Sequence, residues 1–150
     1  MMRAFKNANW LIVAAAIIGL GSTYLMQAWL NPHSWLHGEI LPWTDTWEDI
    51  RFGSKFQVVL NKAFRYLLND LFSILLIHGL FQNRTYTRFA VWVLIFGLFV
   101  LVPIYLLLVF YAPSGYSSMI SHLHRIIMNP VLMMLLIPYY YMLESQKKEE

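Results

Sequence analysis

The chain has 150 residues, of which 59% are apolar and only 13% are charged, and its mean hydropathy is +0.52. Soluble domains are usually about 45–50% apolar and about a quarter charged, and a soluble domain of this size cannot bury so much apolar surface. The composition therefore predicts an integral membrane protein. The absence of cysteine excludes disulfides and thiol nucleophiles, and the net charge of +3, spread over scattered Lys and Arg residues, predicts no nucleic-acid binding.

Four apolar segments follow one another, so we expect an all-α membrane protein with four transmembrane helices. The expected helices cover residues 10–30, 64–81, 89–111 and 120–143, with an outer loop at 31–63 and a cytoplasmic tail at 144–150. The first segment carries no charge and would be about 31 Å long as a helix, which matches a hydrocarbon core. Its apolar run is longer than that of a signal peptide and no A-x-A cleavage site follows, so we expect it to be retained.

Prolines interrupt two of the expected helices. Pro103 lies near the middle of the third segment, where we expect a kink that a membrane helix can tolerate. Pro130 and Pro138 lie in the fourth segment, which predicts that this helix is not straight.

Basic residues near the helix ends predict the orientation. Arg3 and Lys6 precede the first helix, Arg84 and Arg88 lie between the second and third helices, and residues 31–50 contain no Lys or Arg. The totals on the two sides are nearly equal, but the first helix usually dominates. We therefore expect a multi-pass protein of the bacterial inner membrane with both termini in the cytoplasm.

The outer loop is rich in tryptophan. Trp29, Trp35, Trp43 and Trp47 lie in or beside it. Because tryptophan prefers the headgroup level, these residues predict an aromatic belt with the loop lying on the outer leaflet. The alternative is an aromatic groove for a peptide or a partner helix. Residues 50–64 mix apolar with basic side chains, which is typical of an interfacial lead-in to the second helix.

Polar residues occupy one half of the helical wheel of the second segment. They are Asn61, Lys62, Arg65, Tyr66, Asn69, Asp70 and Ser73. Ionisable residues at membrane depth normally face the bundle interior or a wet cavity, so we expect this face to point inward, with Asp70 paired to Arg65, Tyr66 or a neighbouring helix. Two interpretations stay open: a polar seam that holds the bundle together, or a functional site.

An Arg-x-x-x-Asn pattern occurs in both the second and the fourth segments. It predicts that these two parallel helices are neighbours whose arginines approach a common basic pocket for a carboxylate or phosphate. The candidate partner or anion site comprises Arg65, Tyr66, Asn69, Asp70, His122, Arg125 and Asn129. The alternative is that both arginines only anchor their helices by snorkelling to the outer interface.

No catalytic, cofactor or metal site is expected. The chain has no Ser/His/Asp triad motif, HExxH motif or phosphate loop. Histidines on the outer side could bind zinc or copper in principle, but Pro32 and Gly38 argue against the helix that would align His33 with His37. His78 stands alone on an apolar helix and is expected to be a hydrogen-bonded packing residue.

Small residues recur on the first helix at Ala15, Gly19 and Thr23. This spacing lets another helix approach closely. The sequence leaves open whether that helix belongs to this chain or to a partner.

The run NKAFRYLLND at 61–70, Arg125 with Asn129 and Pro130, and the run LLIPYYY at 135–141 are similar to sequences of a known family. With these motifs the chain resembles the exosortase F system-associated membrane proteins of Bacteroidota, best over residues 59–141. The resemblance implies an accessory role beside exosortase F, a membrane transpeptidase for proteins with a C-terminal sorting signal. Exosortases use a Cys, Arg and His set, and this chain has no cysteine.

We therefore expect a non-enzymatic membrane accessory protein that binds exosortase F or the membrane tail of its substrate. The alternative is a small transporter or lipid-handling protein with an anionic ligand between the second and fourth helices. An intramembrane hydrolase that uses Asp70 or His78 is disfavoured, because no second Asp or Glu lies within the four apolar segments to form a carboxylate pair.

Overall fold

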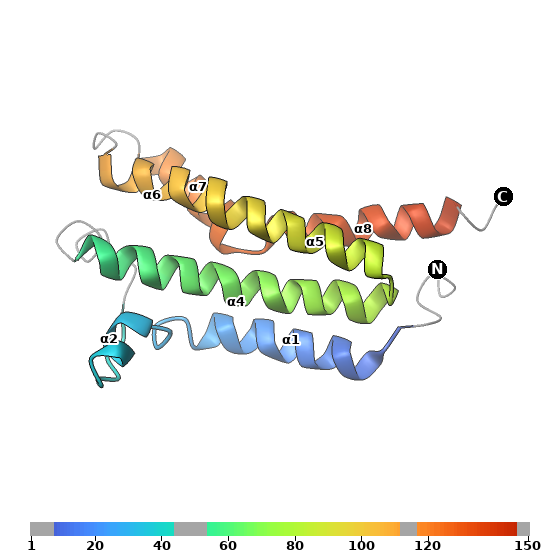
Figure 1. Cartoon of the computed structure of the whole chain (residues 1–150), viewed down its shortest axis with the longest axis horizontal. Coiled ribbons are helices and arrows are strands. Elements are labelled where there is room, and N and C mark those ends of the chain that lie inside the picture. Colours follow the sequence, from blue (N-terminus) through green and yellow to red (C-terminus); the bar gives the residue numbers. More distant parts are fainter. Residues whose placement is uncertain (1–7, 44–53, 112–116, 147–150) are drawn as a thin grey trace.

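The computed structural model describes residues 8–43, 54–111 and 117–146, of which 84% are helical and none forms a strand. In chain order the elements are α1 (Trp10–Leu25), α2 (Pro32–Leu36), α4 (Lys55–Phe81), α5 (Arg84–Phe96), the π-helix η1 (Gly97–Leu101), α6 (Val102–Tyr111), α7 (Ser117–Met128) and α8 (Val131–Gln146) (Figure 1). The all-helical fold that we predicted is therefore confirmed for these residues.

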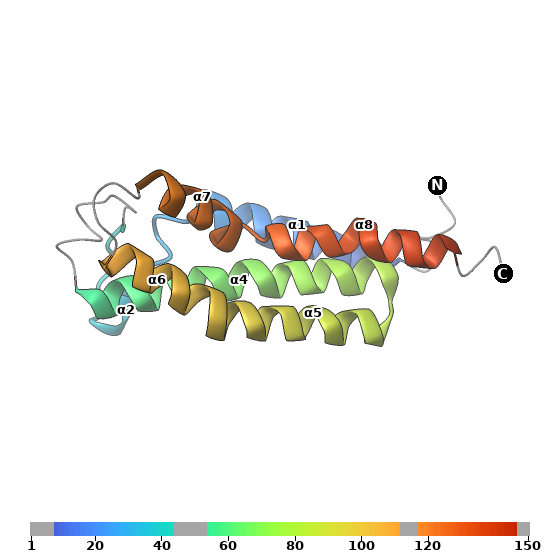
Figure 2. The ribbon, with the colours of Figure 1, turned by 90° about the horizontal axis from the view of Figure 1, so that it is seen from above.

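The long helices lie side by side, and α4 is the central one (Figures 1 and 2). It packs against α1, α5, α7 and α8, while α5 also packs against α8 and α6 against α7. The chain runs in alternating directions, so α4 and the α7–α8 pair are parallel neighbours, as predicted for the second and fourth segments. The start of α1, the turn between α4 and α5, and the end of α8 all lie at one end of the bundle (Figure 1).

Two helical stretches are long and apolar enough to cross a membrane: Lys55–Phe81 and Arg84–Tyr111. The bent α7–α8 pair is a third if its two halves form one span. Helix α1 is apolar but has only 16 residues.

Several expected boundaries are corrected, and the helix expected at 89–111 begins at Arg84. Helix α1 ends at Leu25 and turns follow, because Asn31 and Pro32 begin a separate helix, α2. Helix α4 begins at Lys55 rather than near residue 64, because the polar residues Asn61 and Lys62 are buried on its inner face and do not interrupt it. The expected outer loop at 31–63 therefore contains α2 and the first turns of α4.

Directly before Pro103, where we expected a kink, the third expected helix contains a wider turn. Arg84–Tyr111 remains one helical stretch, but Gly97–Leu101 forms a π-helix directly before Val102 and Pro103. A proline removes one backbone donor and its ring crowds the preceding turn, and a wider turn relieves that crowding. Gly97, the first residue of this π-helix, leaves room for the Tyr66 hydroxyl of α4, which a Cβ at this position would overlap.

The fourth segment is broken, as its prolines predicted. Helices α7 and α8 meet at Asn129 and Pro130 with a bend of 53°. Pro138 lies inside α8 without ending it. Helix α8 continues to Gln146, into the stretch that we expected to form the tail.

The small residues of α1 are used within this chain. Ala16 and Thr23 are buried, Ala15 is exposed, and a side chain on Gly19 would overlap the ring of Phe72 on α4. At the other end of the same contact, Gly79 of α4 lies against Val13, and the backbone N–H of Asn9 donates to the Gly79 carbonyl at 2.8 Å. Small residues on both helices thus let α1 and α4 approach closely.

Replacing Gly19 by leucine should therefore destabilise the fold, because the larger side chain must displace Phe72. We expect a loss of about 1–3 kcal/mol, typical of overpacking. Gly21 is the matched control, since it is exposed on the same helix and its Cβ would meet nothing within 4 Å. Thermal unfolding in mild detergent should show a lower midpoint for Gly19→Leu, whereas Gly21→Leu should match or exceed the parent. Equal midpoints for the two variants would contradict the described contact.

Candidate functional site

The polar face of α4 points into the bundle, as its helical wheel predicted. The buried members are Asn61, Lys62, Arg65, Tyr66, Asp70 and Ser73, and Asn69 is half-buried. Lys62 has no exposed surface at all. Such a row is stable only when each polar group meets a partner that replaces water.

At the N-terminal end of α4 this polar face binds the segment that follows α1. The Asn61 amide donates to Asn31 Oδ1 at 2.9 Å and accepts from the His33 backbone N–H at 3.3 Å. Asn31 in turn donates to the Leu41 carbonyl at 3.0 Å and caps α2 through the Ser34 N–H. These bonds fix residues 31–41 on α4.

Trp43 covers the two cations of the polar face. The Lys62 ammonium lies 5.5 Å and the Arg65 guanidinium 5.0 Å from the centroid of its ring, both within cation–π range. Arg65 also donates to the backbone carbonyl of Trp43 at 3.4 Å, and the backbone N–H of Trp43 donates to the Ala28 carbonyl at 2.7 Å. Trp43 is therefore a buried cover for charged groups and not a member of an interfacial belt.

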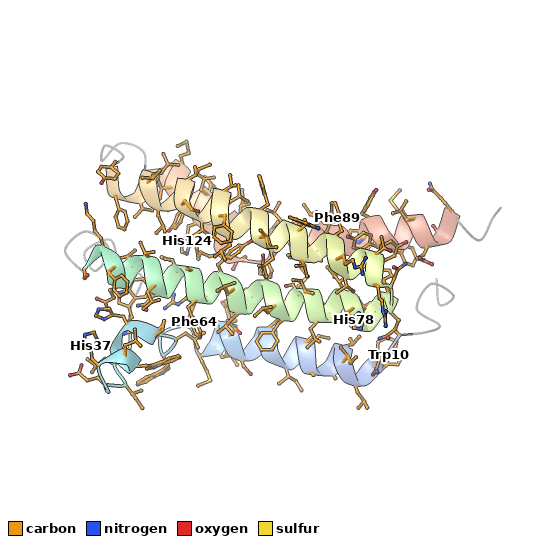
Figure 3. All side chains as sticks on the ribbon, in the orientation of Figure 1. Trp10, His37, Phe64, His78, Phe89 and His124 are labelled. Carbon is orange, nitrogen blue, oxygen red and sulfur yellow. The ribbon has the colours of Figure 1, made fainter. Side chains whose placement is uncertain are left out.

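Unlike Trp43, the other described tryptophans are exposed, as the predicted aromatic belt requires. Trp29 and Trp35 are exposed, and so is Trp10 at the opposite end of the bundle, where Figure 3 labels it. Trp47 lies outside the described residues.

His124 (labelled in Figure 3) joins three helices. Its Nδ1 lies 2.8 Å from the Tyr105 hydroxyl of α6 and 3.5 Å from the Lys62 ammonium of α4. The histidine on α7 is thus part of the same polar network as the cations of α4.

Deeper in the bundle, Asp70 and Asn69 make separate contacts. The Tyr66 hydroxyl lies between the Asp70 carboxyl, its side-chain hydrogen-bond partner one turn away, and the Leu94 carbonyl at 3.5 Å. The Asn69 amide donates to the Met128 carbonyl at 2.8 Å, at the end of α7. We predicted that Asp70 pairs with Arg65, Tyr66 or a neighbouring helix, and its hydrogen-bond partner here is Tyr66.

The break between α7 and α8 leaves a cavity of about 180 Å³. Its polar lining consists of Thr23, Tyr24, Gln27, Arg65, Asn69, His124 and Asn129. Asn129 is exposed, so the polar network reaches the surface at this point. One guanidinium together with amide donors can bind a carboxylate, a phosphate oxygen or a backbone carbonyl.

The structure brings together only part of the predicted site. Arg65, Asn69 and Asn129 line the cavity, whereas Tyr66 and Asp70 are buried without lining it. His122 and Arg125 are exposed on α7 and do not reach it, so the prediction that Arg125 and Arg65 share this pocket is wrong. The reason is the rotation of α7: its buried side carries Ile120, Ile127 and Met128, as well as the half-buried His124. Arg125 follows His124 by one residue and therefore points about 100° away.

Sequence reasoning did not place His124, Gln27 or Trp43 in this site. His124 could have been found, because it lies four residues after Ile120 and three before Ile127, on one helix face. Gln27 and Trp43 follow or precede helices and have no periodic pattern that would place them.

The other histidines do not join this site. The expectation that Pro32 and Gly38 oppose a helix here is wrong, because Pro32–Leu36 forms α2 with the proline in its first turn. The rings of His33 and His37 are tilted with their centroids 4.7 Å apart, and His37 Nδ1 contacts the His33 carbonyl oxygen at 2.8 Å. His78 hydrogen-bonds to Thr87 at 3.0 Å and links α4 to α5, as a packing residue should. Within residues 8–43, 54–111 and 117–146, no three His, Asp or Glu side chains gather as metal ligands.

No family model, curated protein or solved structure matches this chain. Its function is therefore inferred from the geometry of the cavity and the polar network.

Proposed function

We propose that the chain is a four-pass membrane protein with both termini in the cytoplasm, and that it serves as a non-enzymatic accessory subunit that binds a membrane partner. The partner we propose is an exosortase-type sorting enzyme or the membrane tail of its substrate. The observation that carries the proposal is the polar cavity at the α7–α8 break, where buried donors reach the surface of an otherwise apolar bundle.

The outer face of α1 supports a fourth span. Leu11 and Leu25, at the two ends of this helix, are 84% and 80% exposed, and Ile17 and Ile18 between them are exposed as well. Lipid tails would cover these side chains, and α1 lies along the membrane-length helix α4. Sixteen residues span about 24 Å, so the turns after Leu25 would complete the crossing.

The cavity suits a partner's polar group inside the membrane. Its volume of about 180 Å³ is smaller than the 300–1,000 Å³ typical of small-molecule pockets, which fits one side chain, a chain-terminal carboxylate or an exposed backbone carbonyl. Arg65, Asn69 and Asn129 supply the donors.

The second candidate, a transporter or lipid-handling protein, draws on the same cavity. The lining of Arg65 and His124 favours an anionic ligand. A free ligand would raise the unfolding temperature of the isolated protein, whereas a partner-binding site needs the partner. Screening soluble carboxylates and phosphates against the purified protein therefore separates the two candidates.

The orientation can be tested with introduced cysteines, since the chain has none. Glu39 and Thr85 are both exposed and lie towards opposite ends of the bundle. In spheroplasts with an intact inner membrane, Glu39→Cys should react with an impermeant maleimide and Thr85→Cys should react only after permeabilisation. The reverse pattern would invert the proposed topology. Labelling of both without permeabilisation would place the two sites on the same side and exclude the single crossing by α4 between them.

Partner binding can be tested by co-purification with a co-expressed exosortase in mild detergent. Arg65→Lys keeps the charge but loses the planar fork, so we expect about ten-fold less recovered partner. Asn129→Ala changes the exposed rim of the same cavity without touching the buried network and should also reduce recovery. Arg125→Lys is the matched control and should recover the parental amount. If neither cavity variant differs from this control, or if the parent recovers no partner, the proposal fails.

A further inference from the structure

A second groove lies at the opposite end of the bundle, beside the turn between α4 and α5. It has a volume of about 400 Å³, within the range of small-ligand pockets. Arg84 and Arg88 line its end near the turn, and Val91, Trp92 and Ile95 line the part further along α5. Helix geometry explains this order: these residues recur at intervals of three and four and form one stripe about 16 Å long.

The polar side chains in the groove have definite roles. His78 and Thr87 hydrogen-bond to each other at 3.0 Å and hold α4 and α5 together beneath the arginines. No Asp or Glu is among the described residues that line the groove. The nearby carboxylate of Glu144 accepts from the hydroxyl of Tyr86, a buried residue on a different side of α5. The groove is therefore cationic at one end and apolar along the rest.

We propose that this groove binds an anionic glycerophospholipid, with the phosphate between Arg84 and Arg88 and an acyl chain along Val91, Trp92 and Ile95. The two guanidinium groups match a phosphate with net negative charge. The apolar stripe would gain nothing from a free inorganic anion, and Trp92, 69% exposed, offers a large surface to an acyl chain. This inference is independent of the proposed partner at the other cavity.

A lipid at this place has a physical rationale in a membrane protein. Basic residues just outside a hydrocarbon core attract anionic headgroups, and the groove gives that general attraction a defined geometry. If the orientation proposed above is right, the groove faces the cytoplasmic leaflet, but the proposal needs only that Arg84 and Arg88 lie at headgroup level.

The test uses the full chain in vesicles of phosphatidylcholine that contain a fixed fraction of phosphatidylglycerol. Bromine on the acyl chains of one lipid at a time quenches nearby tryptophans, and the difference between the parent and Trp92→Phe isolates the Trp92 signal. We expect brominated phosphatidylglycerol to quench Trp92 with an apparent preference of about ten-fold over brominated phosphatidylcholine at low salt.

Variants decide whether the arginines cause this preference. Arg84→Gln with Arg88→Gln should abolish it, whereas the control pair Lys55→Gln with Arg125→Gln removes the same charge away from the groove and should retain it. Millimolar inorganic phosphate should not reverse the preference. Equal quenching by both lipids in the parent, a preference that survives loss of Arg84 and Arg88, or displacement by free phosphate would each overturn the proposal.

A second measurement guards against misfolding of the double variant. Native mass spectrometry of the parent, extracted in mild detergent, should show retained phosphatidylglycerol in preference to phosphatidylcholine. Retention of both lipids in proportion to their abundance in the membrane would contradict a specific groove without recourse to any variant.

Discussion

Charged side chains inside an apolar bundle require groups that replace the water they have lost, and this requirement organises the structure around α4. Lys62 and Arg65 meet it through the ring of Trp43, and Lys62 also reaches His124. These partners come from the segment after α1 and from α7, which are far apart in the sequence. Covering the two cations therefore brings both segments to the same stretch of α4.

The rest of the bundle divides along α4 accordingly. Its N-terminal half carries Asn61, Lys62 and Arg65, whereas its C-terminal half packs Ile74 and Ile77 against α5 and α8. The α7–α8 break falls beside Arg65 and Asn69, near the junction of these halves, and leaves the polar cavity there. Under the proposed function, a partner would meet these donors where the cavity opens to the surface.

Much of this architecture could be predicted from the sequence, because it follows from periodicity and from proline chemistry. The wheel of residues 61–73 placed the polar face inside, and Pro130 and Pro138 predicted that the fourth segment is not straight. The direction of Arg125 could not be predicted from its repeat with Arg65, since a sequence repeat does not determine how α7 is rotated about its own axis. Trp43 lies in an irregular segment with no period, so only the folded chain reveals it as the cover of the cations.

The most direct test of the account is a double-mutant cycle between Arg65 and Trp43. Arg65→Met and Trp43→Leu, singly and together, are compared by their free energies of unfolding in mild detergent. Stacking of a desolvated guanidinium on the ring predicts a coupling energy of about 1–2 kcal/mol. The same cycle with the exposed Trp29 should give a coupling near zero. A coupling near zero for Trp43 as well would contradict the claim that these cations hold the outer segment on α4.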